Sequence, residues 1–257
     1  MPRAKTPDVA IRANDLSLTH GDVRVLDGVS FEVAHGETLT VMGPTGAGKS
    51  SLAAILAGRA GNALAVAGGE AVVEGISIKH PGRALRTLTY LAGYLPQGAG
   101  ASLPSRLTVS EVIGEPITSR DRRVNPRALA VRVATLLDEM KLPLGAAPKY
   151  PYELSAGMRQ RVAMARALVL DPRLLVADDL YANLDIEVRN AVREAIVRRR
   201  ASYGMSALIV TNDPDAAREL DSDVLVLRAG HTVAYGADAR SMVWTPDEAN
   251  DHRAVVR

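Results

Sequence analysis

The sequence of 257 residues contains no cysteine. Disulfide bonds, thiolate metal sites and iron–sulfur clusters are therefore excluded, and the composition agrees with a reducing compartment. No segment approaches the roughly 20 apolar residues that a membrane-spanning helix needs. No apolar stretch follows residues 1–5, so we expect no signal peptide. If the protein works at a membrane, we expect a partner to bring it there.

The sequence also has little net charge. Its 31 Lys and Arg residues against 29 Asp and Glu residues leave a formal charge of +2, which is too small to indicate a polyanionic partner. Residues 198–200 form a run of three arginines at the end of a helical pattern. We expect this run to complement the helix dipole and to face solvent. We therefore predict no nucleic-acid partner.

Apolar runs alternate with helical patterns along the chain, which predicts an α/β fold with a parallel sheet covered on both faces. Several short strands are expected within residues 9–42, and further strands at residues 71–73, 90–95, 174–177, 207–210 and 224–227. Helices are expected at residues 109–113, 127–140 and 155–170, and from Ile186 onward. Residues 98–150 have the character of a helical insertion, and the chain after Gly236 that of a short polar tail.

Residues 43–50 match the phosphate-loop pattern G-x-x-x-x-G-K-[ST]. A buried strand is expected before them, at residues 37–42, and helical spacing follows them. Glycines let the backbone turn so that several N–H groups point at phosphate oxygens, and the helix N-terminus adds its positive end. Lys49 reaches the β- and γ-phosphates, and the Ser50 hydroxyl ligates Mg²⁺. The predicted phosphate-binding residues are Gly43, Pro44, Thr45, Gly46, Ala47, Gly48, Lys49, Ser50 and Ser51.

A phosphate loop alone leaves kinases, small GTPases and many ATPases open. A second motif separates these classes, because residues 150–161 read YPYELSAGMRQR. This segment resembles the signature sequence of ABC-transporter ATPase subunits. The other motifs of this family occur along the chain in the order that the family has. Gln97 matches the Q-loop glutamine, residues 174–178 match the Walker B strand, and Asp185 matches the D-loop aspartate that lies near the nucleotide. The segments around Gln97 and before Ser155 are most similar to the dipeptide, oligopeptide and nickel importer branch.

The resemblance implies the fold of that family, which is a P-loop NTPase core with a parallel sheet, an antiparallel β edge subdomain and an inserted helical subdomain. We expect a single ABC ATPase domain over residues 1–257, with its core at residues 8–97 and 165–236, its helical subdomain at 98–164 and a tail at 237–257. The resemblance also implies that two chains hold two ATP molecules head to tail. Ser155, as a helix N-cap, and Gly157 would then face the γ-phosphate bound by the partner. Ser50, Gln97 and Asp178 would hold Mg²⁺.

Three positions depart from the family pattern. Asp179 stands where the family has the glutamate that polarises the attacking water, and its side chain is shorter by about 1.5 Å. Asn212 stands where the family has a switch histidine, and it carries no charge near neutral pH. His20 stands where an aromatic ring stacks on adenine, with less area than tyrosine. The expected catalytic residues are therefore Gln97, Asp179 and Asn212, in a site that holds ATP but cuts it weakly.

The resemblance implies the ATP-binding and hydrolysing subunit that powers an ABC transporter, most similar to importers of peptide, nickel or a similar small solute. It implies ATP and Mg²⁺ as cofactors, and membrane permease subunits as partners, docked against residues 98–118. A second ATPase subunit would complete a heterodimer at the cytoplasmic face of the membrane. Two alternatives stay open. The first is a homodimer in which Asp179 and Asn212 support slow hydrolysis. The second is a soluble ATP-gated regulatory or scaffolding protein.

Overall fold

A computed structural model describes residues 9–181, 184–236 and 243–244. Its larger sheet has seven strands in the order β11-β10-β9-β3-β8-β7-β6. The parallel part consists of β6 (Ala92–Leu95), β7 (Leu174–Asp178), β8 (Ser206–Val210), β3 (Thr38–Met42) and β9 (Asp223–Arg228). The predicted parallel sheet is thereby confirmed. An antiparallel edge, β10 (His231–Gly236) and β11 (Val243–Trp244), extends it beyond the expected strands.

The smaller sheet is antiparallel and has the strand order β2-β1-β4-β5. Its strands are β1 (Val9–His20), β2 (Val23–Ala34), β4 (Leu64–Val73) and β5 (Ile76–Ser77). The expectation of several short strands before β3 is wrong, because β1 and β2 have 12 residues each. Register shifts along the pair, one of them between Ala13 and Leu16, interrupt the alternation of side chains. A strand with such irregularities therefore resembles shorter strands in sequence.

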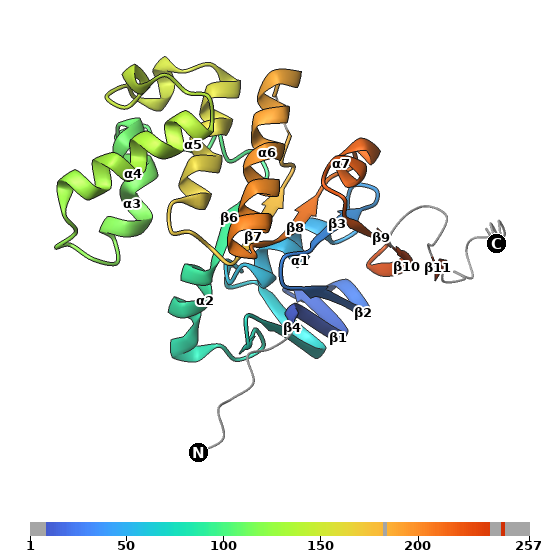
Figure 1. The fold of residues 1–257 in the computed structure, drawn as a ribbon. Helices are drawn as coiled ribbons and strands as arrows, with labels where there is room; N and C mark the ends of the chain where they lie inside the picture. Colours follow the sequence, from blue (N-terminus) through green and yellow to red (C-terminus); the bar gives the residue numbers. More distant parts are fainter. Residues whose placement is uncertain (1–8, 182–183, 237–242, 245–257) are drawn as a thin grey trace.

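Seven α-helices accompany the two sheets in the described part of the chain (Figure 1). They are α1 (Lys49–Leu56), α2 (Leu85–Leu91), α3 (Val109–Thr118), α4 (Pro126–Glu139), α5 (Ala156–Leu168), α6 (Ile186–Tyr203) and α7 (Pro214–Glu219). Short 3-10 turns occur at Gly82–Ala84, Leu144–Ala146 and Pro151–Glu153. The expected strand at residues 90–95 begins only at Ala92. Leu85, Leu88 and Leu91 recur at helical spacing, and Leu88 is buried, so the chain is helical up to that point.

The central strands bury both of their faces, as the continuous apolar runs predict. Leu174 and Val176 of β7 belong to the core shared with α1 and the antiparallel sheet. Their neighbours Leu175 and Ala177 belong to the core on the opposite face, shared with α3, α4, α5 and α6. Helix α1 contacts β4 on one side and β7 and β8 on the other. The molecule is therefore layered, with α1 between the two sheets.

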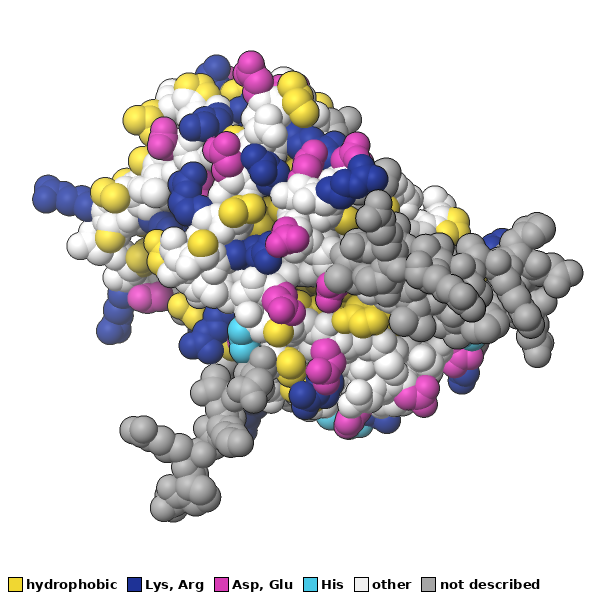
Figure 2. Space-filling view, turned by 45° about the vertical axis from the view of Figure 1, so that its right-hand side comes forward, with side chains coloured by type: hydrophobic (Ala, Val, Ile, Leu, Met, Phe, Trp, Pro, Cys, Tyr) yellow, Lys and Arg dark blue, Asp and Glu magenta, His cyan; other side chains and the backbone are white. Residues whose placement is uncertain are grey.

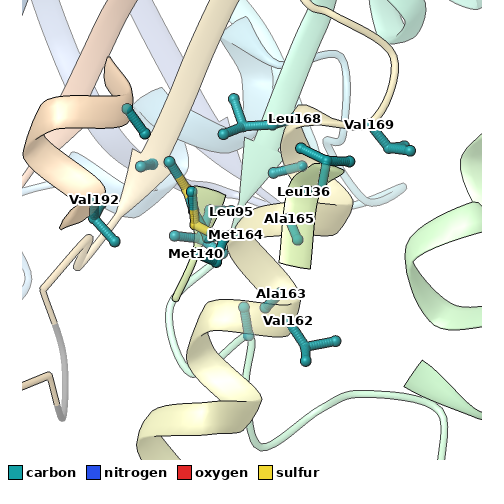
Figure 3. Packing of buried hydrophobic residues seen from close by; sticks show 14 of the residues in the cluster. Leu95, Leu136, Met140, Val162, Ala163, Met164, Ala165, Leu168, Val169 and Val192 are labelled. Atoms are coloured by element: carbon teal, nitrogen blue, oxygen red, sulfur yellow. The ribbon is translucent and has the colours of Figure 1, made fainter. Parts of the chain in front are cut away.

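Helices α3, α4 and α5 lie together on one side of the parallel sheet (Figure 1). Thr108 and Glu111 form a reciprocal capping box at the start of α3, and Asn125 accepts from two backbone N–H groups at the start of α4. Figure 3 shows that Leu136 and Met140 pack with α5 residues in the same cluster as Leu95 of β6. The core of the helical part is therefore continuous with one face of the sheet.

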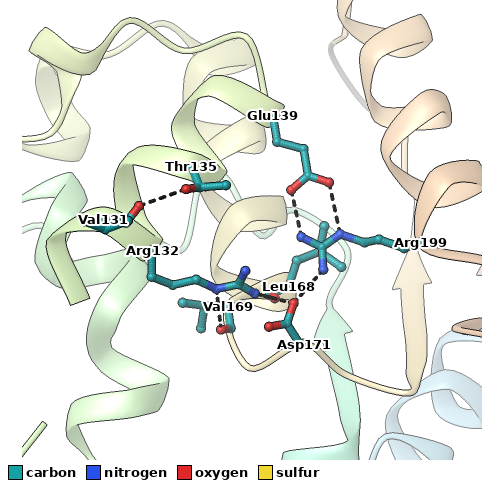
Figure 4. Close-up of polar contacts among 8 residues, drawn as sticks. All are labelled: Val131, Arg132, Thr135, Glu139, Leu168, Val169, Asp171 and Arg199. Carbon is teal, nitrogen blue, oxygen red and sulfur yellow. Dashed lines mark hydrogen bonds and ion pairs between the residues drawn. The ribbon is translucent and has the colours of Figure 1, made fainter. Parts of the chain in front are cut away.

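A charge network, buried at Arg199 and Glu139 and exposed at Asp171, joins α4 to the end of α6 (Figure 4). Arg199 donates to both carboxylate oxygens of Glu139, at 3.0 and 2.7 Å, and to Asp171 at 3.0 Å. Arg132 donates to the same carboxylate of Asp171 at 2.5 Å. The expectation that the arginine run faces solvent is therefore wrong for Arg199, which is 6% exposed. Arg199, the middle residue of the run, lies on a helix face that packs against α4, and bidentate carboxylate pairing makes burial of its guanidinium tolerable.

Basic and acidic side chains are interspersed on the face shown in Figure 2. Neighbouring charges of opposite sign largely cancel beyond the Debye length of about 8 Å at physiological salt. The described residues of this face therefore present mixed charge rather than a field of one sign, in keeping with the small net charge.

We predict that Arg199→Ala destabilises the fold by about 3 kcal/mol, because it leaves the buried Glu139 carboxylate without its partner. The matched control is Arg198→Ala, which removes the same charge from an exposed neighbouring position and should cost less than about 0.5 kcal/mol. Urea unfolding of the two variants measures the difference. Equal losses would show that the Glu139 pair contributes nothing specific.

Candidate functional site

The site begins at the loop between β3 and α1. Gly43 and Gly48 have φ values of 139° and 94°, which favour glycine. A Cβ at Gly43 would lie 2.0 Å from the Leu227 carbonyl oxygen, and one at Gly48 would lie 2.4 Å from the Val25 carbonyl oxygen. Gly48 is also the N-cap of α1 and supplies no side-chain cap. The N–H groups of the first turn are therefore left for an acceptor from outside the helix.

The Lys49 ammonium lies within the curve of this loop. Its Nζ donates to the carbonyl oxygens of Gly43 at 2.6 Å and of Pro44 at 2.9 Å. Burial lowers the pKa of Lys49, and the nearby Asp178 carboxylate opposes that effect. Two carbonyl oxygens of the loop thus hold the Lys49 ammonium beside the start of α1, and a cation in this place suits the binding of a polyphosphate.

A pocket of about 470 Å³ opens beside the loop. It brings together residues from five separate segments of the sequence. Its lining consists of Val25, Thr45, Gly46, Ala47, Gly48, Lys49, Ser50, Ser51, Gln97, Asp178, Asp179, Val210, Thr211, Asn212 and Asp213. Most of the predicted phosphate-binding residues and all of the predicted catalytic and metal-binding residues therefore lie around one cavity.

Asp178 is the most buried acidic group of this pocket, at 4% exposure. Burial raises its pKa, a hydrogen bond from Ser50 lowers it, and the charge of Asp179 raises it again. The same carboxylate also influences Tyr94, whose pKa is raised to about 12 by burial and by Asp178. The Asp178 carboxylate therefore lies in a partly desolvated environment where a cation would be strongly favoured.

The donors beside Asp178 fit Mg²⁺. Ser50 and Asp178 are hydrogen-bonded to each other, and Gln97 lines the same pocket. All three offer oxygen atoms, which Mg²⁺ prefers, and this ion is usually held by one or two carboxylates together with substrate phosphates. No group of three or more His, Cys, Asp or Glu side chains that could hold a metal ion occurs among the described residues.

Asp179 and Asn212 line the rim of the pocket, where each follows one of two neighbouring parallel strands. Asp179 has a φ of 62° and donates its backbone N–H to Val210 at 2.9 Å. Aspartate adopts this left-handed conformation more readily than longer side chains do, because its carboxylate bonds locally. The backbone at this position therefore favours the residue that the sequence carries over the glutamate of the family pattern.

Six predicted nucleotide-binding residues do not line the pocket. His20 is exposed at the end of β1, where it pairs with Val23 across the hairpin. Ser155 and Gly157 lie at the start of α5, where the Ser155 hydroxyl accepts from Met158 N–H at 3.2 Å as the predicted N-cap. Asp185 caps α6 by accepting from Val188 N–H at 2.9 Å. The remaining two, Gly43 and Pro44, contact Lys49 through their carbonyl oxygens.

Parts of the predicted domain lie outside the described residues. They are residues 1–8, together with residues 182–183 before Asp185, and most of the tail after residue 236.

Four lining residues escaped the sequence analysis, namely Val25, Val210, Thr211 and Asp213. Val210 and Thr211 continue strand β8 directly into Asn212, so their place follows from that of Asn212. Val25 lies on β2 beside Gly48, and no pattern in the sequence pairs this strand with the loop. It could be found only from the fold.

The parallel sheet, the phosphate loop and the carboxylates at its edge define a P-loop nucleotide-binding protein. The ABC transporter family profile matches residues 26–182. This match covers more than half of the chain, so the protein belongs to the ABC transporter family.

Curated relatives agree with this family. The oligopeptide transport ATP-binding protein OppD of Mycobacterium tuberculosis is 33% identical over 237 residues, which are 91% of this chain and 37% of that protein. The glutathione import ATP-binding protein GsiA of Escherichia coli is 32% identical over 229 residues, which are 88% of this chain and 36% of that protein. The chain thus spans little more than a third of the length of these relatives.

Solved structures agree with the fold. A dimeric structure of the ATP-binding cassette MJ0796 bound to ADP and Pi superposes with a TM-score of 0.80 at 24% identity. The match covers 88% of this chain and 97% of that one. In the described part of the chain, the helices are too short or too polar to cross a membrane.

The contacts of the loop predict unequal costs for two glycine substitutions. Gly46→Ala and Gly48→Ala both place a side chain at positive φ, which costs about 1–2 kcal/mol. Gly46 has open space around it, whereas at Gly48 the new methyl group meets the Val25 carbonyl. Gly48→Ala should therefore cost about 1–3 kcal/mol more, through overpacking. Urea denaturation tests this difference, and equal stabilities would contradict the close approach of loop and β2.

Proposed function

We propose that this chain is the ATP-binding and hydrolysing subunit that powers an ABC transporter, and that the transporter imports a peptide or a similar small solute. The observation that carries the proposal is the single pocket shared by the phosphate loop, Gln97, Asp178 and Asn212. Family membership supports ATP as the nucleotide. The names of the oligopeptide and glutathione relatives support import of a small solute.

Removal of the Lys49 ammonium tests nucleotide binding directly. Lys49→Ala should weaken Mg·ATP affinity by about 10- to 100-fold, because it deletes a charge-assisted hydrogen bond of about 1.5–3 kcal/mol. Lys79→Ala removes the same charge from an exposed position outside the pocket and serves as the control. Isothermal titration calorimetry measures both affinities. If the two variants bind ATP equally well, the phosphate-loop assignment fails.

We propose further that this pocket binds ATP but hydrolyses it slowly. Asp179 reaches about 1.5 Å less far than glutamate would, and a misplacement of about 1 Å can cost a catalytic group roughly a hundredfold. Asn212 offers one amide donor in place of an ionisable ring. Asp179 and Asn212 are both weaker catalytic groups than those of the family pattern, whereas the phosphate loop is intact. This combination supports a site that still binds ATP but has lost much of its rate of hydrolysis.

Restoring both groups should raise the rate of ATP hydrolysis. The variant Asp179→Glu with Asn212→His should exceed the wild-type rate by about tenfold or more, and should exceed the product of the two single effects, since the residues act as a unit. Asp179→Glu alone should gain less, because the left-handed backbone disfavours the longer side chain. Phosphate release under saturating Mg·ATP is the measurement. A rapid wild-type rate that the double change leaves unaltered would refute the weakened site.

A second ATPase subunit would complete the arrangement. Ser155 and Gly157 lie at the exposed start of α5, away from the pocket of their own chain. Free N–H groups of that helix start suit the γ-phosphate of a nucleotide on another subunit. We therefore propose a head-to-tail dimer, and the weakened rim favours a heterodimer whose partner carries intact catalytic residues. Asp185 and His20 are proposed to contribute at the edges of the nucleotide site.

A membrane permease is the other proposed partner, and it would hold the chain at the cytoplasmic face of the membrane. A cavity of about 340 Å³ lies between α2 and β6 of the core and α3 and α5 of the helical part. Glu115 and Pro116, within the expected docking stretch 98–118, line one side of it. We propose that the permease docks there, and that residues 98–164 form the helical subdomain. Co-purification with a permease separates this function from that of a soluble regulatory protein.

A further inference from the structure

Arg189, in the first turn of α6, contacts three segments at once. Its Nη1 donates to Asp213 Oδ2 at 2.5 Å, and its Nε donates to Glu219 Oε2 at 3.0 Å. Its Cζ lies 4.4 Å from the centre of the Tyr181 ring. The side chain of Arg189 is 18% exposed, so these contacts are largely shielded from solvent. We name Tyr181, Arg189, Asp213 and Glu219 the Arg189 cluster.

The ionic contacts of the cluster persist at neutral pH. Burial would lower the pKa of Arg189, but its hydrogen bonds to Glu219 and Asp213 raise that pKa overall. Burial would raise the pKa of Asp213, but hydrogen bonds from the Asp215 N–H and from Arg189 lower it overall. Both groups are therefore charged, and a guanidinium is the side chain whose fork can serve two carboxylates while its face covers an aromatic ring.

The cluster reaches both loops that end at the rim of the nucleotide pocket. Tyr181 is the second residue after Asp179, and Asp213 directly follows Asn212. Asp213 is fixed twice more, because its N–H donates to Thr211 at 3.0 Å and its Oδ1 accepts from Asp215 N–H at 3.0 Å. Arg189 itself does not line the pocket. Its side chain therefore lies behind the rim and joins the loop after β7 to the loop after β8.

We propose that Arg189 is a positioning residue that fixes Asp179 and Asn212 relative to each other at the γ-phosphate end of the pocket. This inference rests on the proposed binding of ATP. Nothing in the phosphate loop depends on the Arg189 cluster, since the loop is held by Val25, Leu227 and Lys49. Loss of Arg189 should therefore disturb recognition of the γ-phosphate and spare that of the α- and β-phosphates.

Arg189 contacts the aromatic ring of Tyr181 rather than its hydroxyl group. The Tyr181 Oη is buried and has no hydrogen-bond partner among the described residues. Removal of an unpaired buried hydroxyl is close to neutral when the remaining shape is kept. Tyr181→Phe therefore preserves the face that Arg189 covers and is the matched control for the cluster.

The test compares the affinities of ATP and ADP, each with Mg²⁺, for the full chain and its variants. In Arg189→Met, ATP should bind about tenfold more weakly, as is typical when a residue that supports a ligating group is lost, while ADP affinity changes less than twofold. Arg189→Lys should recover part of the loss, and Glu219→Gln, which weakens one ion pair outside the pocket, should give a smaller loss of the same kind. Tyr181→Phe and the exposed Arg198→Met should match the wild type.

The outcomes separate the two levels of the proposal. Equal losses of ATP and ADP affinity, or no loss in any cluster variant, would overturn the positioning role while leaving ATP binding intact. A wild-type chain that binds neither nucleotide would overturn the proposed function itself, and the positioning role with it. Urea titrations show whether Arg189→Met folds. If it does not, Arg189→Lys and Glu219→Gln test the positioning role instead, through the loss of ATP affinity relative to the loss of ADP affinity.

Discussion

The nucleotide site depends on a close approach between the phosphate loop and the backbones of two other strands. At Gly43 the loop touches the Leu227 carbonyl of β9, and at Gly48 it touches the Val25 carbonyl of β2. Neither contact leaves room for a methyl group. The loop is therefore held between the parallel sheet and the antiparallel sheet, and it cannot relax toward either one. The backbone of the loop keeps its shape because the two sheets fix both of its ends.

The other walls of the pocket follow from the parallel strands. The loop follows β3, Gln97 follows β6, Asp178 ends β7, and Asn212 follows β8. These strands are neighbours in the order β3-β8-β7-β6, and parallel strands bring their carboxyl ends to one edge. Residues more than 160 positions apart in the sequence thereby meet around one cavity. The wide spacing of these motifs is a consequence of the crossovers between strands, each of which carries a helix.

The sequence was sufficient for the features that local chemistry dictates. The phosphate loop, the buried strand before Asp178 and the cap at Ser155 each rest on a short pattern with a physical cause, and the structure has them as predicted. The roles proposed for Asp179, Asn212 and His20 stay predictions, because they depend on a bound nucleotide and a second subunit.

Features that depend on distant packing were beyond the sequence. Arg199 belongs to a run of arginines that is typical of a solvated helix end, and only the position of α4 places Glu139 against it. Val25 shares no pattern with Gly48, although the two are in contact. The lengths of β1 and β2 were missed because bulges break the alternation on which strand prediction depends.

Helix α6 connects the two charge clusters that tertiary packing creates. Arg189 lies in its first turn, behind the rim of the pocket, and Arg199 lies near its end, against α4. Ten residues of helix separate them by about 15 Å. A helix is stiff over this distance, so a displacement of its start is transmitted to its end unless a kink intervenes. Any movement of the rim that carries Arg189 with it must therefore strain the buried pair of Arg199 and Glu139, and that pair opposes displacement of α6 relative to the helical part.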